Sequence, residues 1–135
     1  MDAMSPFAFG FPAWWRRAFE AATRLQPDPA GVVEKWFHPD QIRSVVRGHV
    51  ILKHLEQAGL LDSCFDEFHD LEALRAGGTA HFLRNYAGLT VFAWKSASRR
   101  RGVPSLYEMN GKLWTLRRSL DNHWSSIDPA LRHIR

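Results

Sequence analysis

The chain has 135 residues, of which 45% are hydrophobic, 13% aromatic and 24% charged, and this composition excludes a disordered, collagen-like or disulfide-scaffold protein. A single compact domain of this length buries roughly two-thirds of the surface of its unfolded chain, so neither a metal nor a disulfide is needed for stability. The one cysteine, Cys64, leaves no internal disulfide and fits a reducing compartment.

Apolar runs in the sequence are short, and none approaches the roughly 20 residues that a membrane-spanning helix requires. The N-terminus has no Lys or Arg before Arg16 and no leucine-rich segment, which is unlike a secretory signal. We therefore predict a cytoplasmic protein.

Charge is distributed unevenly along the chain. Residues 1–75 contain 8 Lys and Arg against 11 Asp and Glu, whereas residues 76–135 contain 10 against 3. Fourteen of the 18 basic residues are arginine, whose planar guanidinium binds phosphate or carboxylate groups through two parallel hydrogen bonds. This favours a polyanionic or acidic partner for the C-terminal half, and the alternative is a solvated surface that keeps the protein soluble.

Residues 1–11 have no helical period. Phe7, Phe9 and Phe11 alternate with other residues there, and Trp14 follows shortly after. We interpret residues 1–11 as an extended aromatic arm that covers its rings, because exposed apolar surface costs about 25 cal/mol per Å². The arm can complete the protein's own core, dock on a partner or a second subunit, or lie on a membrane surface.

Apolar residues recur at helical spacing through most of the remaining chain. Prolines separate the first segments, and Gly59 is a suitable left-handed C-cap for the third. Gly77 and Gly78 end the fourth, whose polar face is acidic, and Thr79 can cap the fifth. The predicted helices cover residues 12–26, 29–37, 42–59, 62–77, 79–94 and 105–120, with a last short helix opening at Asp128.

Two C-terminal segments decide the fold class. Residues 89–94 are β-prone and could form a buried strand, but we favour a helix because the apolar pattern extends beyond the usual length of a strand. In residues 105–120 the large apolar residues follow the 3-4-3-4 spacing of a helix-packing seam. The seam consists of Leu106, Met109, Leu113, Leu116 and Leu120.

The sequence therefore predicts an all-α protein, with a single compact domain of six or seven helices over residues 12–135 and an extended N-terminal aromatic arm over residues 1–11. No internal repeat or linker divides the chain. The expected core comprises Trp15, Phe19, Leu52, Leu55, Phe68, Leu83, Leu113, Leu116 and Leu120.

One segment resembles a DNA-binding motif. Residues 40–61 have Gly48 at the position of the turn in a helix-turn-helix, and the ending LEQAGLL resembles the close of the recognition helix in winged-helix regulators. The resemblance implies a helix that reads the major groove. His49 and His54 depart from it, because they fall where the motif buries apolar side chains, and no β-wing pattern follows.

The basic C-terminal half carries the candidate nucleic-acid site. Trp114 lies three and four residues before Arg117 and Arg118 on the predicted helix, so the guanidinium groups can stack on the indole. With the nearby basic run they could follow a phosphate backbone while the indole stacks on a base. The alternative is a core indole with solvated arginines. The predicted site comprises Arg99, Arg100, Arg101, Lys112, Trp114, Arg117 and Arg118.

Signatures of catalysis are missing from the sequence. It has no phosphate-binding glycine loop, nucleophile elbow, dinucleotide fingerprint or zinc-protease motif. His49, the pair His69 and Asp70, and Asp121 superficially resemble the ordered ligands of HD-type phosphohydrolases, but the pair falls within a predicted acidic helix instead of ending an apolar one. We therefore predict a non-enzymatic protein without a catalytic residue, metal or cofactor.

As function we expect binding to nucleic acid or a nucleoprotein complex through the arginine-rich face, with phosphate neutralisation supplying most of the affinity. The alternative is a protein-interaction module, such as an inhibitor, adaptor or small subunit, or a homo-oligomer. It would dock through the aromatic arm or through the acidic helix of residues 62–72. The candidate residues for this alternative are Phe7, Phe9, Phe11, Trp14, Asp66, Glu67 and Asp70.

Overall fold

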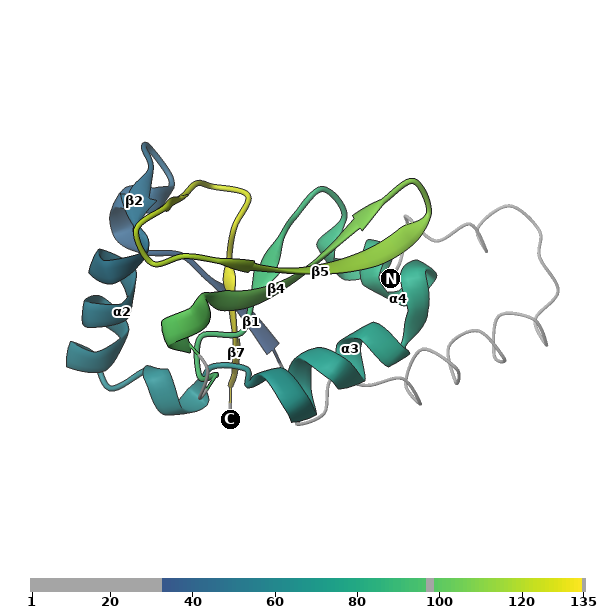
Figure 1. Ribbon diagram of the computed structural model, residues 1–135, viewed down its shortest axis with the longest axis horizontal. Coiled ribbons are helices and arrows are strands. Elements are labelled where there is room, and N and C mark those ends of the chain that lie inside the picture. Colours follow the sequence, from purple (N-terminus) through teal and green to yellow (C-terminus); the bar gives the residue numbers. More distant parts are fainter. Residues whose placement is uncertain (1–32, 97–98, 135) are drawn as a thin grey trace, which may run out of the picture.

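The computed structural model describes residues 33–96 and 99–134, which form a mixed α/β fold, so the prediction of an all-α helical domain is wrong (Figure 1). The strands are β1 (Val33–Trp36), β2 (Val46–Arg47), β3 (Val91–Phe92), β4 (Val103–Met109), β5 (Lys112–Arg118), β6 (His123–Trp124) and β7 (Ala130–His133). The helices are α2 (Gly48–Gln57), α3 (Glu72–Ala76) and α4 (Gly78–Tyr86), with short helical turns η2 (Pro39–Gln41), η3 (Leu61–Ser63), η4 (Glu67–Leu71) and η5 (Arg99–Arg101).

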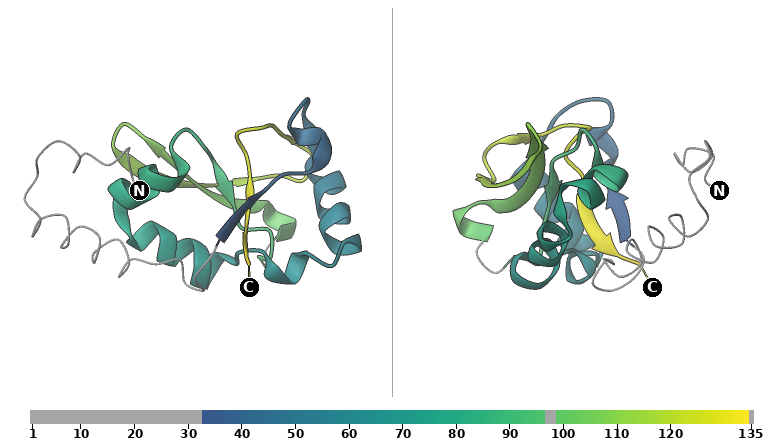
Figure 2. Two further views of the ribbon diagram at one scale, coloured as in Figure 1. Left: turned by 180° about the vertical axis from the view of Figure 1, so that it is seen from behind. Right: turned by 90° about the vertical axis from the view of Figure 1, so that its right-hand side faces the viewer.

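Five of the strands form one sheet in the order β1-β7-β3-β4-β5, and β2 pairs with β6 in a small second sheet. Neighbours in the large sheet are antiparallel, except that β3 and β7 run parallel. Seen from behind in Figure 2, β1 and β7 lie on the side away from the hairpin of β4 and β5. The last strand inserts between β1 and β3, which leaves β1 and β5 as the two edges.

Buried side chains form two clusters, one on each face of the large sheet. Successive residues of a strand point to opposite faces, so Val91 and Phe92 enter different clusters although both are fully buried. The cluster on the α2 side contains Val46, Ile51, Leu55, Cys64, Phe92, Trp94, Val103, Trp124 and Ala130. The cluster on the α4 side contains Phe65, Leu71, Leu74, Phe82, Tyr86, Val91, Ala93, Leu106 and Leu131.

The expected core is partly correct. Leu55 is buried, and four further leucines pack at the borders of the two clusters. Phe68 and Leu116 are wrong, because they are 76% and 60% exposed. The bordering leucines are Leu52, Leu83, Leu113 and Leu120.

Residues 105–120 lie mainly in a β-hairpin and not in the predicted helix. The turn between β4 and β5 is Asn110–Gly111, and both residues have positive φ, 54° and 80°, as a type I′ turn requires. The predicted seam is divided between the two faces of the sheet, with Leu106 buried and Leu116 exposed. Its 3-4-3-4 spacing does not mark one face of a helix. It arises by coincidence from apolar residues on both faces of two strands that are joined by a two-residue turn.

The strand alternative for residues 89–94 is correct, and the favoured helix is wrong. α4 ends at Tyr86, and Gly88 has a φ of 78° in the loop that leads to β3. β3 lies between β4 and β7, so Val91 and Phe92 are buried on opposite faces. A strand covered on both faces lacks polar alternation, which is why periodicity did not distinguish it from a buried helix.

The predicted helix over residues 42–59 begins only at Gly48, because strand β2 precedes it. A Cβ at Gly48 would lie 2.6 Å from the ring of Trp124, so glycine permits the close approach of α2 to β6. Gly48 opens α2 instead of linking two helices, and the helix-turn-helix interpretation is therefore wrong. The end of α2 is confirmed, because Gly59 has a φ of 72° and closes a Schellman motif.

The acidic helix begins later than predicted, after η3 and an extended stretch. Its N-cap is Asp66 and not residue 62 or 63. The Asp66 carboxylate accepts hydrogen bonds from the backbone amides of His69 and Asp70, at 2.8 and 3.0 Å. The helix ends at the C-cap Gly77, as predicted.

The remaining expectations concern the two ends of the chain. The structure describes residues 33–37 of the helix predicted over 29–37, and they contain strand β1 instead. The helix predicted from Asp128 is also wrong, because β7 follows there and pairs with β1, with Val33 opposite His133. No helix in residues 33–96 and 99–134 is long and apolar enough to cross a membrane. The features that lie outside the described residues are the arm of residues 1–11 with Phe7, Phe9 and Phe11, then Trp14, the helix of residues 12–26, Trp15 and Phe19.

Candidate functional site

The predicted cationic residues divide between the two ends of the β4–β5 hairpin. Lys112 and Arg118 are the first and last residues of β5, which separates them by about 20 Å at roughly 3.3 Å per residue. Trp114 lies toward the Lys112 end, where its Nε1 donates to the Met109 carbonyl at 3.2 Å. The basic turn η5 precedes β4 at the other end, and its Arg100 is exposed.

Arg117 forms an ion pair with the acidic helix. Its Nη2 lies 2.7 Å from Oε1 and 2.5 Å from Oε2 of Glu67, and its Nη1 donates to the Gly102 carbonyl at 3.1 Å. The side chains of Glu67 and Arg117 are only 19% and 33% exposed. The charge of this arginine is therefore compensated within the protein.

Arg118 is held in the same way, on the other face of β5. Its Nη1 lies 3.0 Å from Oδ2 of Asp128, which is 5% exposed, and donates to the His123 carbonyl at 3.2 Å. The guanidinium carbon lies 4.8 and 5.1 Å from the ring centroids of Phe92 and Trp124. These contacts make Arg118 a structural residue that joins β5 to the loop before β7.

The outer side of β5 is an unpaired sheet edge. The Pro104 carbonyl in β4 accepts a hydrogen bond from the Ala93 amide, so the backbone groups of Pro104 point away from β5. Alternation along the paired strands then directs the backbone groups of Leu113, Thr115 and Arg117 outward. Within residues 33–96 and 99–134, no strand pairs with this side of β5. An extended polypeptide could bind to these donors and acceptors.

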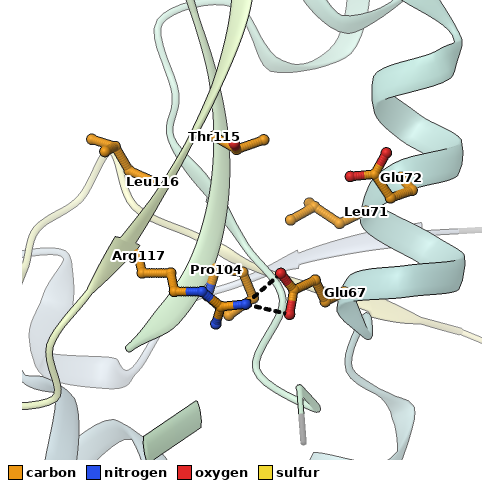
Figure 3. Close-up of a pocket in the computed structure, with 7 residues that line it drawn as sticks. All are labelled: Glu67, Leu71, Glu72, Pro104, Thr115, Leu116 and Arg117. Atoms are coloured by element: carbon orange, nitrogen blue, oxygen red, sulfur yellow. Dashed lines mark hydrogen bonds and ion pairs between the residues drawn. The ribbon is translucent and has the colours of Figure 1, made fainter. Parts of the chain in front are cut away.

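A groove of about 380 Å³ runs beside this edge (Figure 3). Strand β5 forms one wall, and η4 with the first residue of α3 forms the other. Thr115 and Glu72 belong to these opposite walls, while the buried Leu71 and Pro104 lie between them. The ion pair of Glu67 with Arg117, described above, bridges the two walls. The groove thus combines an apolar base with polar walls.

The opposite face of the hairpin carries an exposed apolar row. Met109, Trp114 and Leu116 are 46%, 46% and 60% exposed. They share one face, because alternate residues of a strand point the same way and Met109 pairs with Lys112. Large apolar side chains beside an unpaired edge are typical of an interaction surface.

Asp66 stabilises the start of the acidic helix. Burial raises the pKa of this carboxyl group, but hydrogen bonds from the backbone amides of Asp70 and His69 and the charges of His69 and Lys95 outweigh burial. They hold the pKa of Asp66 below its usual 3.8. Asp66 therefore acts as an ionised helix cap.

Asp70 is also a structural residue. It is 9% exposed, and its Oδ2 lies 3.0 Å from Nε2 of His133 and accepts a hydrogen bond from the Asp66 amide at 2.9 Å. The His133 ring stacks on Phe65 with a centroid distance of 4.8 Å. Of the three acidic residues predicted for docking, only Glu67 lines the groove.

The residues that resemble phosphohydrolase ligands separate into different ion pairs. His49 Nε2 lies 3.0 Å from Oδ1 of Asp121 in an exposed pair, whereas Asp70 pairs with His133. No group of three or more His, Cys, Asp or Glu side chains in the described part of the chain could hold a metal ion.

Sequence reasoning missed the edge strand and its groove, although a local signal was present. Asn-Gly is a strong signal for a two-residue hairpin turn, and Asn110–Gly111 lies between two runs that contain large apolar and aromatic residues. Comparisons of the chain with protein-family models, curated proteins and solved structures find no match.

Proposed function

We propose that this chain is a protein-interaction module that receives an extended polypeptide segment along β5. One observation carries the proposal: the edge of β5, to which no other strand of the described residues pairs, lies between an exposed apolar row on one face and a groove on the other. Backbone hydrogen bonds to an added strand would supply affinity. Its alternate side chains would contact Trp114 and Leu116 on one face and enter the groove on the other, which would supply selectivity.

The contacts around β5 support this proposal because they hold the edge in place before a partner arrives. Arg117 is bound to Glu67 and Gly102, and Arg118 is bound to Asp128. A preordered site loses little conformational entropy when it binds. The groove wall also contains Glu67, one of the acidic residues that the sequence predicts for docking.

Selection of peptides from a phage-displayed random library tests the proposal. We expect selected peptides to bind the natural protein and to lose at least tenfold in affinity for Thr115→Pro, which removes an outward amide from an edge position that tolerates proline. Peptide binding should also slow hydrogen exchange at the Thr115 amide. Selected peptides that bind Thr115→Pro as well as the natural protein would overturn it.

Nucleic-acid binding stays a prediction. Charge compensation of Arg117 and Arg118 leaves the basic turn Arg99–Arg101 at one end of the hairpin and Lys112 at the other. Binding along a phosphate backbone needs cations on one continuous surface, so protein interaction ranks first. We also propose a cytoplasmic location, which the presence of a single cysteine in the sequence supports.

A further inference from the structure

We infer that the segment received by β5 is the β5 strand of a second copy, so that two chains form a symmetric dimer with one continuous sheet. The inference rests on the proposed function, because it names the partner of the same edge. A two-fold symmetric interface must be complementary to itself, and the sequence of β5 can be examined for this property.

The register follows from the backbone directions. Leu113, Thr115 and Arg117 direct their backbone groups outward, and Thr115 is the middle residue of the seven in β5. Antiparallel pairing of two β5 strands about Thr115 therefore places all seven residues opposite a residue of the other copy. Leu113 lies opposite Arg117 in the second copy, and Thr115 lies opposite itself. Pairing about Trp114 or Leu116 would leave residues of the strand unmatched.

This register pairs the two members of the exposed apolar row that lie on β5. Trp114 of each copy lies opposite Leu116 of the other, and these side chains are 46% and 60% exposed in the single chain. Cross-strand pairs of an aromatic with an aliphatic side chain stabilise sheets, and so does a pair of threonines. The symmetric pairing forms the apolar contact twice.

Charges within the strand also permit the pairing. Lys112 of one copy would lie opposite Arg118 of the other, but Asp128 compensates the charge of Arg118 at 3.0 Å. Glu67 compensates Arg117, which would lie opposite the uncharged Leu113. Without these two carboxylates, each arginine would add a positive charge to both halves of the symmetric interface. Those charges would repel the basic residues of β5 in the other copy.

β5 lacks two of the usual protections of an exposed edge, proline and bulges, because it is regularly paired with β4 and contains no proline. Its charged residues lie at the two ends of the strand, at Lys112, Arg117 and Arg118, and leave the middle of the strand uncharged. One pair of strands buries less surface than the roughly 1,200 Å² of a tight complex, so we expect a dimer that dissociates in the micromolar range.

Sedimentation velocity of the full chain over about 1 to 500 μM tests the dimer in this concentration range. We expect a concentration-dependent rise from monomer to dimer mass in the natural protein, and monomer throughout in Thr115→Pro. Circular dichroism and thermal unfolding establish that Thr115→Pro is folded. A natural protein that stays monomeric overturns the inference, as does a dimer that Thr115→Pro leaves unchanged.

Cysteine cross-linking tests the register without relying on a destabilising substitution. Directly opposed residues of a hydrogen-bonded antiparallel pair have Cα atoms about 5.5 Å apart, within the range of a disulfide. We expect Thr115→Cys to form a disulfide-linked dimer on mild oxidation. The matched control Lys112→Cys should not, because its counterpart would lie about 20 Å away along the paired strands. Equal cross-linking of both variants overturns the register.

The two proposals fail separately. If the chain stays monomeric but selected peptides bind β5 and lose affinity for Thr115→Pro, the dimer is rejected and the interaction module is kept. If the dimer forms in the expected register, the selected peptides should compete with it. If neither a second copy nor any peptide binds this edge, both are rejected.

Discussion

Arg117 on the edge strand and Glu67 at the start of the acidic helix are 50 residues apart in the chain, yet Nη2 of the arginine lies 2.5 Å from Oε2 of the glutamate. This pair joins two elements that the sequence assigned to different functions, one to nucleic acid and one to protein docking. It converts a candidate phosphate ligand into a support of the groove beside β5.

We expect Glu67→Gln to lower the free energy of unfolding by about 1–2 kcal/mol, because a half-buried pair falls between exposed pairs, worth about 0–1, and buried ones, whose disruption costs about 3–5. Urea denaturation measures the change. The control is Glu72→Gln. It removes the charge that pairs with Arg75, and because this ion pair is more exposed than that of Glu67 with Arg117, the change should cost less than about 0.5 kcal/mol. Equal losses in the two variants would contradict the structural role of the Glu67–Arg117 pair.

Gly48→Ala should destabilise the protein by about 1–3 kcal/mol through overpacking. The added Cβ would lie 2.6 Å from the Trp124 ring and 2.8 Å from the backbone of Leu120, so backbone must move. Gly59→Ala is the comparison, because its Cβ would meet open space. The only destabilisation there comes from placing alanine in a left-handed backbone conformation, which costs about 1–2 kcal/mol. Thermal unfolding with near-ultraviolet circular dichroism should show altered tryptophan packing in Gly48→Ala alone. An unchanged tryptophan signal would be inconsistent with the close approach of α2 to β6.

His38 should make the stability depend on pH. Burial lowers its pKa below the usual 6.5, the neighbouring His54 lowers it further, and Asp40 opposes both. The folded protein requires the neutral form of the ring at Nδ1. This atom accepts a hydrogen bond from the Asp40 amide at 3.0 Å and thereby caps η2. The unfolded chain therefore binds a proton more readily than the folded one.

The sign follows from this difference. The contribution of His38 to stability is complete above pH 6.5 and is lost as the pH falls from there through the lower pKa of the folded state. The loss cannot exceed about 1.4 kcal/mol per pH unit. Unfolding free energies between about pH 8 and 5 should fall less steeply in His38→Asn, which can still cap a helix, than in the natural protein. A slope in His38→Asn equal to that of the natural protein would refute the assignment.

Alanine at Arg99, Arg100 and Arg101 tests the predicted nucleic-acid face. Each phosphate contact contributes about 0.9 to the slope of log K against log salt for duplex DNA, so loss of three contacts should flatten the slope by up to about 2.7. Fluorescence anisotropy with generic duplex and single-stranded oligonucleotides at two salt concentrations measures this slope. Lys53→Ala, an exposed cation on α2, is the control. Absent binding at low salt, or an unaltered slope in the triple variant, would reject this face.

Parts of the fold that depend on neighbours in sequence were predictable. Gly59 ends α2 and Gly77 caps α3, as expected, because a left-handed or capping residue acts on the adjacent turn. The strand at residues 89–94 was recognised as an alternative but not preferred. The hairpin was missed because apolar residues on two adjacent strands reproduced helical spacing, while the local turn chemistry of Asn110–Gly111 indicated the correct answer.

The sequence by itself determined where α2 and α3 end, where the acidic segment lies and that the C-terminal half is rich in arginine. Only the tertiary structure decided that β5 is an edge, that Leu116 is exposed and that Arg117 and Arg118 are compensated. Helix ends arise from interactions within a turn or two of chain. Strand order and the charge that an arginine retains depend instead on partners such as Glu67, which folding brings together from 50 residues away.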